Sequence, residues 1–357
     1  MSNLEISNYF VHLDNSLRQV IQRIDNGLKG IVFVVDQERH LIDTITDGDI
    51  RRAMLIGLGL DSSIEVFLKK KNRSVYPQPI TARYGKSYKE ILSLMEKHVI
   101  RQIPLVDEAG RVVDLVTIED IMPRENLPMK AVVMAGGFGT RLSPLTDEIP
   151  KPMLPVGDRP LMERIINQLQ QTGIRRVSIT THFMAEKIKN HFGDGREFGV
   201  SIDYVEEDRP LGTAGALGLM KSPDEPLLVI NGDILTRVDF RAMLDFHRKY
   251  QADLTLGVRQ YEVDVPYGVV ERQGPLVKRL REKPRYRFFV NAGIYLLEPS
   301  VHAYIPDDCR FDMTDLIEKL IGDERVVVNF PIMEYWLDIG QPVDYKKAQE
   351  DVENGRV

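Results

Sequence analysis

The chain of 357 residues has little cysteine, no excess of positive charge and no long apolar run, and each shortage excludes a class of protein. Its one cysteine, Cys309, cannot form an internal disulfide, which fits a reducing compartment, so we expect a cytoplasmic protein. The formal net charge of −6 argues against a general nucleic-acid binder. No run reaches the ~18 apolar residues of a membrane helix, and the first residues lack a signal-peptide pattern. We therefore expect no nucleic-acid and no membrane partner.

The remaining composition is that of an ordinary globular protein. Apolar residues make up 43% of the chain and charged residues 28%. The length suggests two domains, or one large one.

The first part of the chain contains an internal repeat whose matching segments keep one constant offset. Val34-Val35-Asp36 recurs as Leu105-Val106-Asp107, and Thr46-Asp47-Gly48-Asp49-Ile50 recurs as Thr117-Ile118-Glu119-Asp120-Ile121. Each copy shows a helical pattern, an apolar strand, a hairpin turn, a second strand and a Thr-x-x-Asp step at which a helix can begin. The repeat predicts two copies of one small α+β unit.

This duplicated pattern resembles a tandem pair of cystathionine-beta-synthase (CBS) domains over residues 1–125, with repeats at about 5–60 and 75–125. The resemblance implies a regulatory module that binds the ribose or phosphate of an adenine nucleotide, through Thr46, Asp49, Thr117 and Asp120. It also implies a homo-oligomer, because such modules commonly pair face to face. The alternative is that these Thr and Asp residues serve only as helix caps. The basic run 69–73 is expected to be a solvated loop between the copies and not a surface that steers an anionic ligand.

A polar stretch with two prolines, residues 123–128, predicts a linker, which we place at 126–129. From residue 130 to residue 357, strand and helix patterns alternate, which predicts an α/β domain with a mostly parallel sheet. Such a sheet binds its ligand at the carboxyl ends of its strands. Strands are expected at 130–134, 176–181, 200–206, 227–232, 252–259, 267–272, 288–297 and 326–332, and helices at 161–172, 184–192, 213–220 and 342–352.

A glycine-rich segment follows the first of these strands, Ala135-Gly136-Gly137-Phe138-Gly139-Thr140-Arg141-Leu142. Glycines at such a position let backbone amides approach phosphate closely. The spacing is neither that of a Walker A loop nor the Gly-x-Gly-x-x-Gly of a dinucleotide fold, so an oxidoreductase is disfavoured. The segment continues as Ser143-Pro144-Leu145-Thr146 and then as Pro150-Lys151-Pro152-Met153-Leu154.

The whole stretch resembles the signature of the sugar-1-phosphate nucleotidyltransferases, also called nucleotide-sugar pyrophosphorylases (EC 2.7.7 class). The resemblance extends from Lys130 to the last predicted helix. It implies a Rossmann-like, glycosyltransferase-A-like sheet and transfer of a nucleotidyl group from an NTP to a sugar 1-phosphate, with release of pyrophosphate. All the reacting groups are anionic, so the protein must align them and neutralise their charge, with Mg²⁺ as the cofactor.

The same resemblance assigns roles to individual residues. Arg141 would clamp the pyrophosphate, because its planar guanidinium grips phosphate in two places, and Lys151 would contact phosphate at the reacting centre. Asp233, after an apolar strand, and Asp338, in Trp336-Leu337-Asp338-Ile339-Gly340, would hold Mg²⁺. The expected catalytic residues are Arg141, Lys151, Asp233 and Lys283. The expected nucleotide-binding residues are Ala135, Gly136, Gly137, Gly139, Thr140, Gly212 and Thr213, and the expected sugar-binding residues are Gly268, Glu282, Lys283, Asn291 and Ala292.

The short section after Asp338 and the CBS pair look most like bacterial proteins grouped with mannose-1-phosphate guanylyltransferases, whose relatives include enzymes of heptose and amino sugars for surface glycans. This favours GTP as the nucleotide, although a uridylyl- or thymidylyltransferase stays open and the sugar is not specified. A nucleotide-sensing protein that has lost activity is the alternative from another class. It is disfavoured, because Arg141, Lys151, Asp233, Lys283 and Asp338 are all present.

Overall fold

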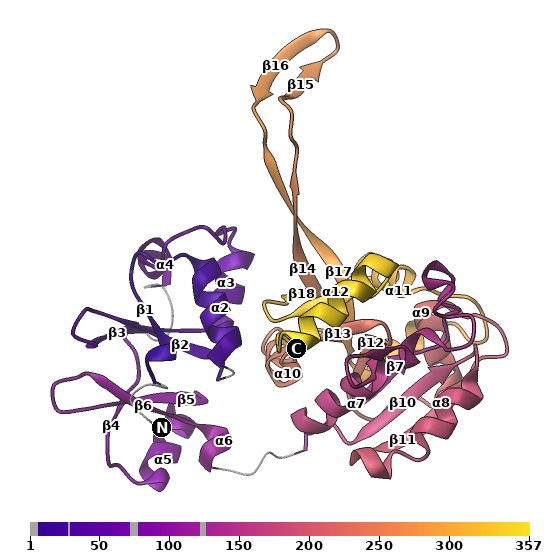
Figure 1. Ribbon diagram of the computed structural model, residues 1–357, viewed down its shortest axis with the longest axis horizontal. Helices are drawn as coiled ribbons and strands as arrows, with labels where there is room; N and C mark the ends of the chain where they lie inside the picture. Colours follow the sequence, from indigo (N-terminus) through magenta and orange to yellow (C-terminus); the bar gives the residue numbers. More distant parts are fainter. Residues whose placement is uncertain (1–5, 28, 72–77, 122–125) are drawn as a thin grey trace. The chain divides into compact units, whose positions relative to one another are not determined.

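The computed structural model describes residues 6–27, 29–71, 78–121 and 126–357. These residues divide into two units, 1–125 and 126–357, which are described separately below (Figure 1).

The first unit contains two three-stranded sheets, β1-β2-β3 and β4-β5-β6, one from each copy of the repeat. The two copies pair their strands in the same register: Val34 lies opposite Asp43, and their counterparts in the second copy, Leu105 and Asp114, also lie opposite each other. The elements of the first copy are β1 (Phe10–Val11), α2 (Leu17–Gly27), β2 (Ile31–Val35), β3 (Leu41–Thr46), α3 (Asp47–Leu55) and α4 (Ile64–Lys71). Those of the second copy are β4 (Ala82–Arg83), α5 (Tyr88–His98), β5 (Gln102–Val106), β6 (Val112–Thr117) and α6 (Ile118–Ile121).

The two copies meet through a pair of reciprocal backbone hydrogen bonds. The Leu41 amide donates to the Gly110 carbonyl (3.3 Å), and the Val112 amide donates to the Arg39 carbonyl (3.1 Å). When each residue of one bond is replaced by its counterpart in the other copy, the other bond results. This reciprocity is the signature of a two-fold relation.

The solvated loop expected at 69–73 is wrong for Lys69 to Lys71, which belong to α4. Ile64 and Phe67 are buried, and Lys71 follows on the same face of the helix, one turn after Phe67. The Lys71 side chain is only 11% exposed and donates to Asp43 Oδ1 at 2.8 Å. Residues 72 and 73 lie outside the described residues. The run was misread because three consecutive lysines hide the helical spacing of the apolar residues before them.

The second unit is built on a seven-stranded sheet with the order β11-β10-β7-β12-β17-β14-β18. Strand β17 is antiparallel to both of its neighbours, and the other adjacent strands pair in parallel. The predicted α/β fold with a mostly parallel sheet is therefore confirmed. The strands are β7 (Lys130–Met134), β10 (Arg176–Thr181), β11 (Ser201–Glu206), β12 (Leu227–Asn231), β14 (Leu254–Asp264), β17 (Arg285–Leu297) and β18 (Val327–Pro331).

Helices pack against both faces of this sheet. One core contains the apolar faces of α7 (Leu161–Thr172), α8 (Ala185–Phe192) and α10 (Phe240–Lys249). The other contains α9 (Gly212–Gly215) and α11 (Met313–Gly322). The last helix, α12 (Pro342–Glu353), packs beside a two-stranded ribbon of β13 (Ile234–Thr236) and β19 (Trp336–Asp338). The sequence patterns had not predicted α10, α11, β13 or β19.

Strands β14 and β17 continue beyond the sheet as a two-stranded arm. Their sheet halves are buried and their distal halves are largely exposed. The arm ends in a hairpin of β15 (Val269–Gln273) and β16 (Leu276–Arg281), and Figure 1 shows it extending away from the sheet. We call residues 261–290 the arm and the rest of the second unit the body. The strand expected at 267–272 is β15, and β16 was not predicted.

Candidate active site

The glycine-rich segment lies at the carboxyl end of β7, near the centre of the sheet. Ala135 is buried and donates its amide to Thr180 O (3.1 Å), whereas Gly137 and Thr140 are exposed. Gly139 has φ +66°, and a Cβ there would lie 3.0 Å from Thr146 Cγ2 and 3.1 Å from Lys151 Cβ. Only glycine fits this position, and the close approach places Lys151 beside the loop.

The two carboxylates predicted to hold a metal come together across the β13–β19 ribbon. Gly232 donates its amide to Met134 O (2.9 Å), which ties the end of β12 to the end of β7. Asp233 comes next, and its carbonyl accepts from the Ile339 amide (3.0 Å), directly after Asp338. The fold thus brings two carboxylates that are far apart in the sequence to one edge of the sheet.

Positive side chains face these carboxylates. Lys151 Nζ lies 2.5 Å from Asp233 Oδ2. Asp338 keeps an exposed face, but desolvation raises the pKa of its carboxyl, and the negative charge of Asp233 adds to this effect, while Lys151 and Arg141 oppose it. The structure therefore gathers Arg141, Lys151, Asp233 and Asp338, four of the predicted site residues.

The chemistry of these donors fits a magnesium ion. Among the described residues, Asp233 Oδ1 and Asn231 Oδ1 are buried side-chain oxygens without a hydrogen-bond partner. The described part of the chain contains no cluster of three or more His, Cys, Asp or Glu that could hold a metal. Magnesium is commonly held by one or two carboxylates together with substrate phosphates and water, so Asp233 and Asp338 suffice on the protein side. The metal itself stays a prediction.

The predicted sugar-binding residues divide into two groups. Asn291 and Ala292 lie at the base of the arm: Asn291 Nδ2 donates to Tyr295 Oη (2.8 Å), and the Ala292 carbonyl accepts from Trp336 Nε1 (2.9 Å). Gly268, Glu282 and Lys283 lie on the arm itself. A Cβ on Gly268 would lie 3.1 Å from Glu282 Oε2, so these two are neighbours. The structure does not place this second group at the carboxylates.

Gly212 and Thr213, predicted to bind the nucleotide, also have a structural role. The Thr213 amide donates to Asp312 Oδ1 (3.1 Å), and the Thr213 hydroxyl accepts from the Met313 amide (2.8 Å). Gly212 has φ +83°, and a Cβ there would lie 2.5 Å from Asp312 Oδ1. The segment is therefore anchored to the start of α11, and its contact with nucleotide stays a prediction.

Sequence reasoning missed one residue of this region, Glu207. Its side chain is 8% exposed; Oε2 accepts from the Leu211 amide (3.0 Å), and a Cβ on Gly136 would lie 2.5 Å from Oε1. Burial raises the pKa of the Glu207 carboxyl, with the Leu211 amide and His182 opposing the shift. The carboxylate thus lies between the two glycine segments. Its only signal in the sequence is its place shortly before Leu211.

In the first unit, the predicted nucleotide ligands hydrogen-bond to each other at the start of a helix in each copy. Asp49 Oδ2 accepts from the amide and hydroxyl of Thr46 (3.0 and 2.9 Å), and Asp120 Oδ2 accepts from those of Thr117 (both 2.8 Å). Asp120 also pairs with Lys29 at 3.0 Å. The capping role is observed for Thr46 and Asp49 at α3, and adenine-nucleotide binding stays a prediction.

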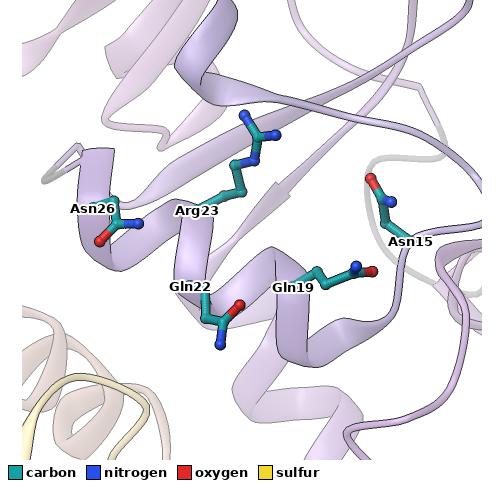
Figure 2. A pocket seen from close by; sticks show the side chains of 5 residues that line it. All are labelled: Asn15, Gln19, Gln22, Arg23 and Asn26. Carbon is teal, nitrogen blue, oxygen red and sulfur yellow. The ribbon is translucent and has the colours of Figure 1, made fainter.

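The first unit also has a surface depression of about 260 Å³, shown in Figure 2, formed by α2 and the loop before it. It is lined by Asn15, Gln19, Gln22, Arg23 and Asn26. None of the four predicted nucleotide ligands lines it. In the described part of the chain, no helix has the length and apolar character needed to cross a bilayer.

Comparison with known proteins identifies both parts of the chain. The nucleotidyl transferase family model matches residues 130–355, and the CBS domain model matches residues 4–56 and 74–124. Over 230 residues the chain is 34% identical to a D-glycero-alpha-D-manno-heptose 1-phosphate guanylyltransferase of Aneurinibacillus thermoaerophilus, covering 63% of this chain and 99% of the relative. It is 32% identical to a mannose-1-phosphate guanylyltransferase of Mycobacterium tuberculosis, covering 63% of this chain but only 65% of that relative's length.

A solved structure shares this fold. It comes from Bacillus anthracis, is described as a glucose-1-phosphate thymidylyltransferase in complex with a sucrose, and is 28% identical, with a TM-score of 0.51 over 62% of this chain and 94% of that one. Together with the family match over residues 130–355, this shows that the chain belongs to the nucleotidyl transferase family, as an enzyme of the EC 2.7.7 class that also carries two CBS domains.

Proposed function

We propose that the protein is a magnesium-dependent guanylyltransferase that joins GTP to a sugar 1-phosphate, giving a GDP-sugar and pyrophosphate. The observation that carries the proposal is the cluster of two cations and two carboxylates, Arg141, Lys151, Asp233 and Asp338, at the carboxyl ends of β7 and β12. Ligands of α/β sheets bind at this edge.

The proposed reaction is an in-line displacement at the α-phosphorus. An oxygen of the sugar phosphate forms a bond to the α-phosphorus, and the bond from that phosphorus to the oxygen bridging to the β-phosphorus breaks, so pyrophosphate leaves with the electron pair. Lys151 would neutralise charge at the reacting centre, and Arg141 would grip the leaving group. Mg²⁺, held by Asp233 and Asp338, would neutralise phosphate oxygens as a Lewis acid.

Glu207 supports guanine as the base. The Watson–Crick edge of guanine presents two adjacent donors, N1–H and the N2 amino group, and an ionised carboxylate only accepts. Uracil and thymine present a single N3–H between two carbonyl oxygens. A carboxylate would repel these oxygens. Glu207 Oε1 lies over Gly136 in the glycine segment, where a nucleobase is expected. The guanylyltransferase names of both curated relatives agree with this choice.

The sugar is proposed to have a manno-configured ring. Both curated relatives are named for such sugars, mannose and D-manno-heptose 1-phosphate. Asn291, which is exposed at the base of the arm, would line this end of the site.

The test is pyrophosphate release by the full-length chain with Mg²⁺, for each of GTP, UTP, dTTP and ATP against the 1-phosphates of mannose, manno-heptose and glucose. We expect release with GTP and a manno-configured substrate. Release of pyrophosphate only with UTP or dTTP would refute guanine as the base and support the uridylyl- or thymidylyltransferase alternative. Nucleotide binding without release from any pair would favour the inactive sensor.

Regulation by adenine nucleotides through the CBS pair is a separate proposal. Repeating the assay with AMP and ATP, beside calorimetry of both nucleotides with the same protein, tests it. A change in rate that is lost in a Thr117→Val/Asp120→Asn variant would support it, and no heat of binding would refute it.

A further inference from the structure

In the described part of the chain, the outer portion of the arm, residues 265–284, makes no hydrogen bond or ion pair with the body. Within the described residues, the hydrogen bonds and ion pairs of residues 265–284 stay inside the arm, as in the β15–β16 ladder and the Arg281–Glu271 pair (2.8 Å). An isolated two-stranded hairpin is marginally stable in water, and its free edges are sites for association. A second surface that covers the arm would remove both problems.

The arm exposes large apolar side chains along its length. Tyr267, Leu276, Val277 and Leu280, near its tip, are between 62% and 74% exposed. Tyr261, Phe288 and Phe289, nearer the base, are also exposed. Large apolar side chains exposed in this number on one hairpin favour contact with a second surface.

The charge of the arm is opposite to that of the body. Residues 261–290 hold seven basic and four acidic side chains, a net +3. Residues 126–357 hold 30 basic and 35 acidic side chains, so the body outside the arm holds 23 and 31, a net −8. Complementary charge favours docking of the arm on a body, and a second copy of this chain supplies one.

The arm also carries site residues that the body lacks. Lys151 and Arg141 serve the nucleotide end of the body site, while Glu282 and Lys283, expected at the sugar-phosphate end, lie on the arm. We propose that the arm of one copy reaches the body of a second copy and completes its active site with Glu282 and Lys283, in a two-fold exchange. The roles of these residues rest on the proposed function, whereas the exchange itself rests on the exposed apolar surface and the charge.

The surface available is sufficient for such an exchange. An aromatic side chain buries about 200 Å². The four aromatic residues Tyr261, Tyr267, Phe288 and Phe289 are each roughly half exposed or more, so together they offer on the order of 400 Å² per arm. Two exchanged arms and the surfaces that they cover then exceed the about 1,000 Å² of a specific interface.

Complementation between two inactive variants tests the exchange. Arg141→Ala damages the body and Lys283→Ala damages the arm; both residues are exposed, so neither change should prevent folding. We expect each variant alone to lose at least about 100-fold in rate. Co-expressed in equal amounts, they should recover about a quarter of wild-type activity, because half of the dimers are mixed and one of their two sites is intact.

If an arm serves its own body, no mixed dimer has an intact site. Wild-type activity without recovery in the mixture would therefore overturn the exchange while leaving the proposed function standing. A wild-type protein without activity on any substrate pair would instead refute the proposed function.

A second measurement needs no activity. In a Cys309→Ser background, which removes the native cysteine, Arg141→Cys and Lys283→Cys are combined in one chain and treated with a short bis-maleimide. Exchange predicts a covalent dimer, and neither single-cysteine variant should give it. A product of monomer mass alone would overturn the proposal, whatever the activity of the enzyme.

Discussion

Replacing Glu207 by glutamine tests whether this buried carboxylate selects the base. The change keeps the shape of the side chain and the acceptor for the Leu211 amide, and it removes the negative charge. A hydrogen bond to a charged group contributes about 1.5–3 kcal/mol. We therefore expect kcat/KM for GTP to fall roughly 10- to 100-fold, because each 1.4 kcal/mol corresponds to about a factor of ten.

The preference for GTP over UTP should fall by a larger factor than kcat/KM for GTP alone. A glutamine side chain offers one acceptor and one donor, which matches the N3–H and a carbonyl oxygen of uracil or thymine. The GTP-to-UTP ratio of kcat/KM should therefore fall further than the GTP value. The matched control is Glu206→Gln at the neighbouring exposed residue, which pairs with Lys189 (2.6 Å) on the surface.

The pH dependence gives an independent readout. Burial raises the pKa of Glu207, so its charge is lost at a higher pH than that of an exposed glutamate. As the pH falls, KM for GTP should rise in the wild type, and this rise should be absent from Glu207→Gln. An unchanged GTP-to-UTP ratio in the variant, measured by pyrophosphate release, would refute the assignment.

Two further predictions concern charges elsewhere in the chain. Asp338→Asn should abolish magnesium-dependent activity and stabilise the fold slightly, by about 0.5 kcal/mol or less at this partly exposed site. The raised pKa of Asp338 means that its ionised form lowers the free energy of unfolding once the pH exceeds the ordinary range of an aspartate, and asparagine carries no such charge. Thermal unfolding with and without Mg²⁺ should show stabilisation by the metal in the wild type only. Lys71→Met leaves Asp43 unpaired at a site where both side chains are nearly buried, so it should destabilise the first unit by about 3 kcal/mol. The exposed Lys70→Met is its control, and equal urea midpoints for the two variants would contradict the buried pair.

The sequence predicted the helices and strands whose local pattern of apolar residues matches the faces that are buried in the fold. The internal repeat reappears in the strand register of both copies, because both carry apolar strand segments and a turn at the same spacing. Strand β7 and helix α7 have the predicted bounds, since each is an uninterrupted apolar or amphipathic run. Helices α10 and α11 were missed although Asp239 and Asp312 cap their starts.

The sequence also predicted most of the side chains that the structure gathers in the body, for a physical reason. Gly139, Arg141 and Lys151 belong to one short segment of the chain, so the spacing within that segment encodes their geometry. Asp233 and Asp338 could be paired only through the family resemblance. Their meeting depends on the short strands β13 and β19, which carry too little pattern to be recognised.

The sequence patterns did not predict the arm, because its strands are not buried by their own chain. A period-two pattern identifies a strand because one of its faces is buried in its own chain. The β16 residues Leu276-Val277-Lys278-Arg279-Leu280-Arg281 are all exposed within the chain, so their pattern was not shaped by a core that the chain itself provides. A second copy of the chain can supply the surface that buries these apolar residues. This would explain why the strand carries them beside charged residues expected at an active site. Expressing the arm variant and the body variant together decides the matter, because only a shared site can be restored by two chains that are each inactive.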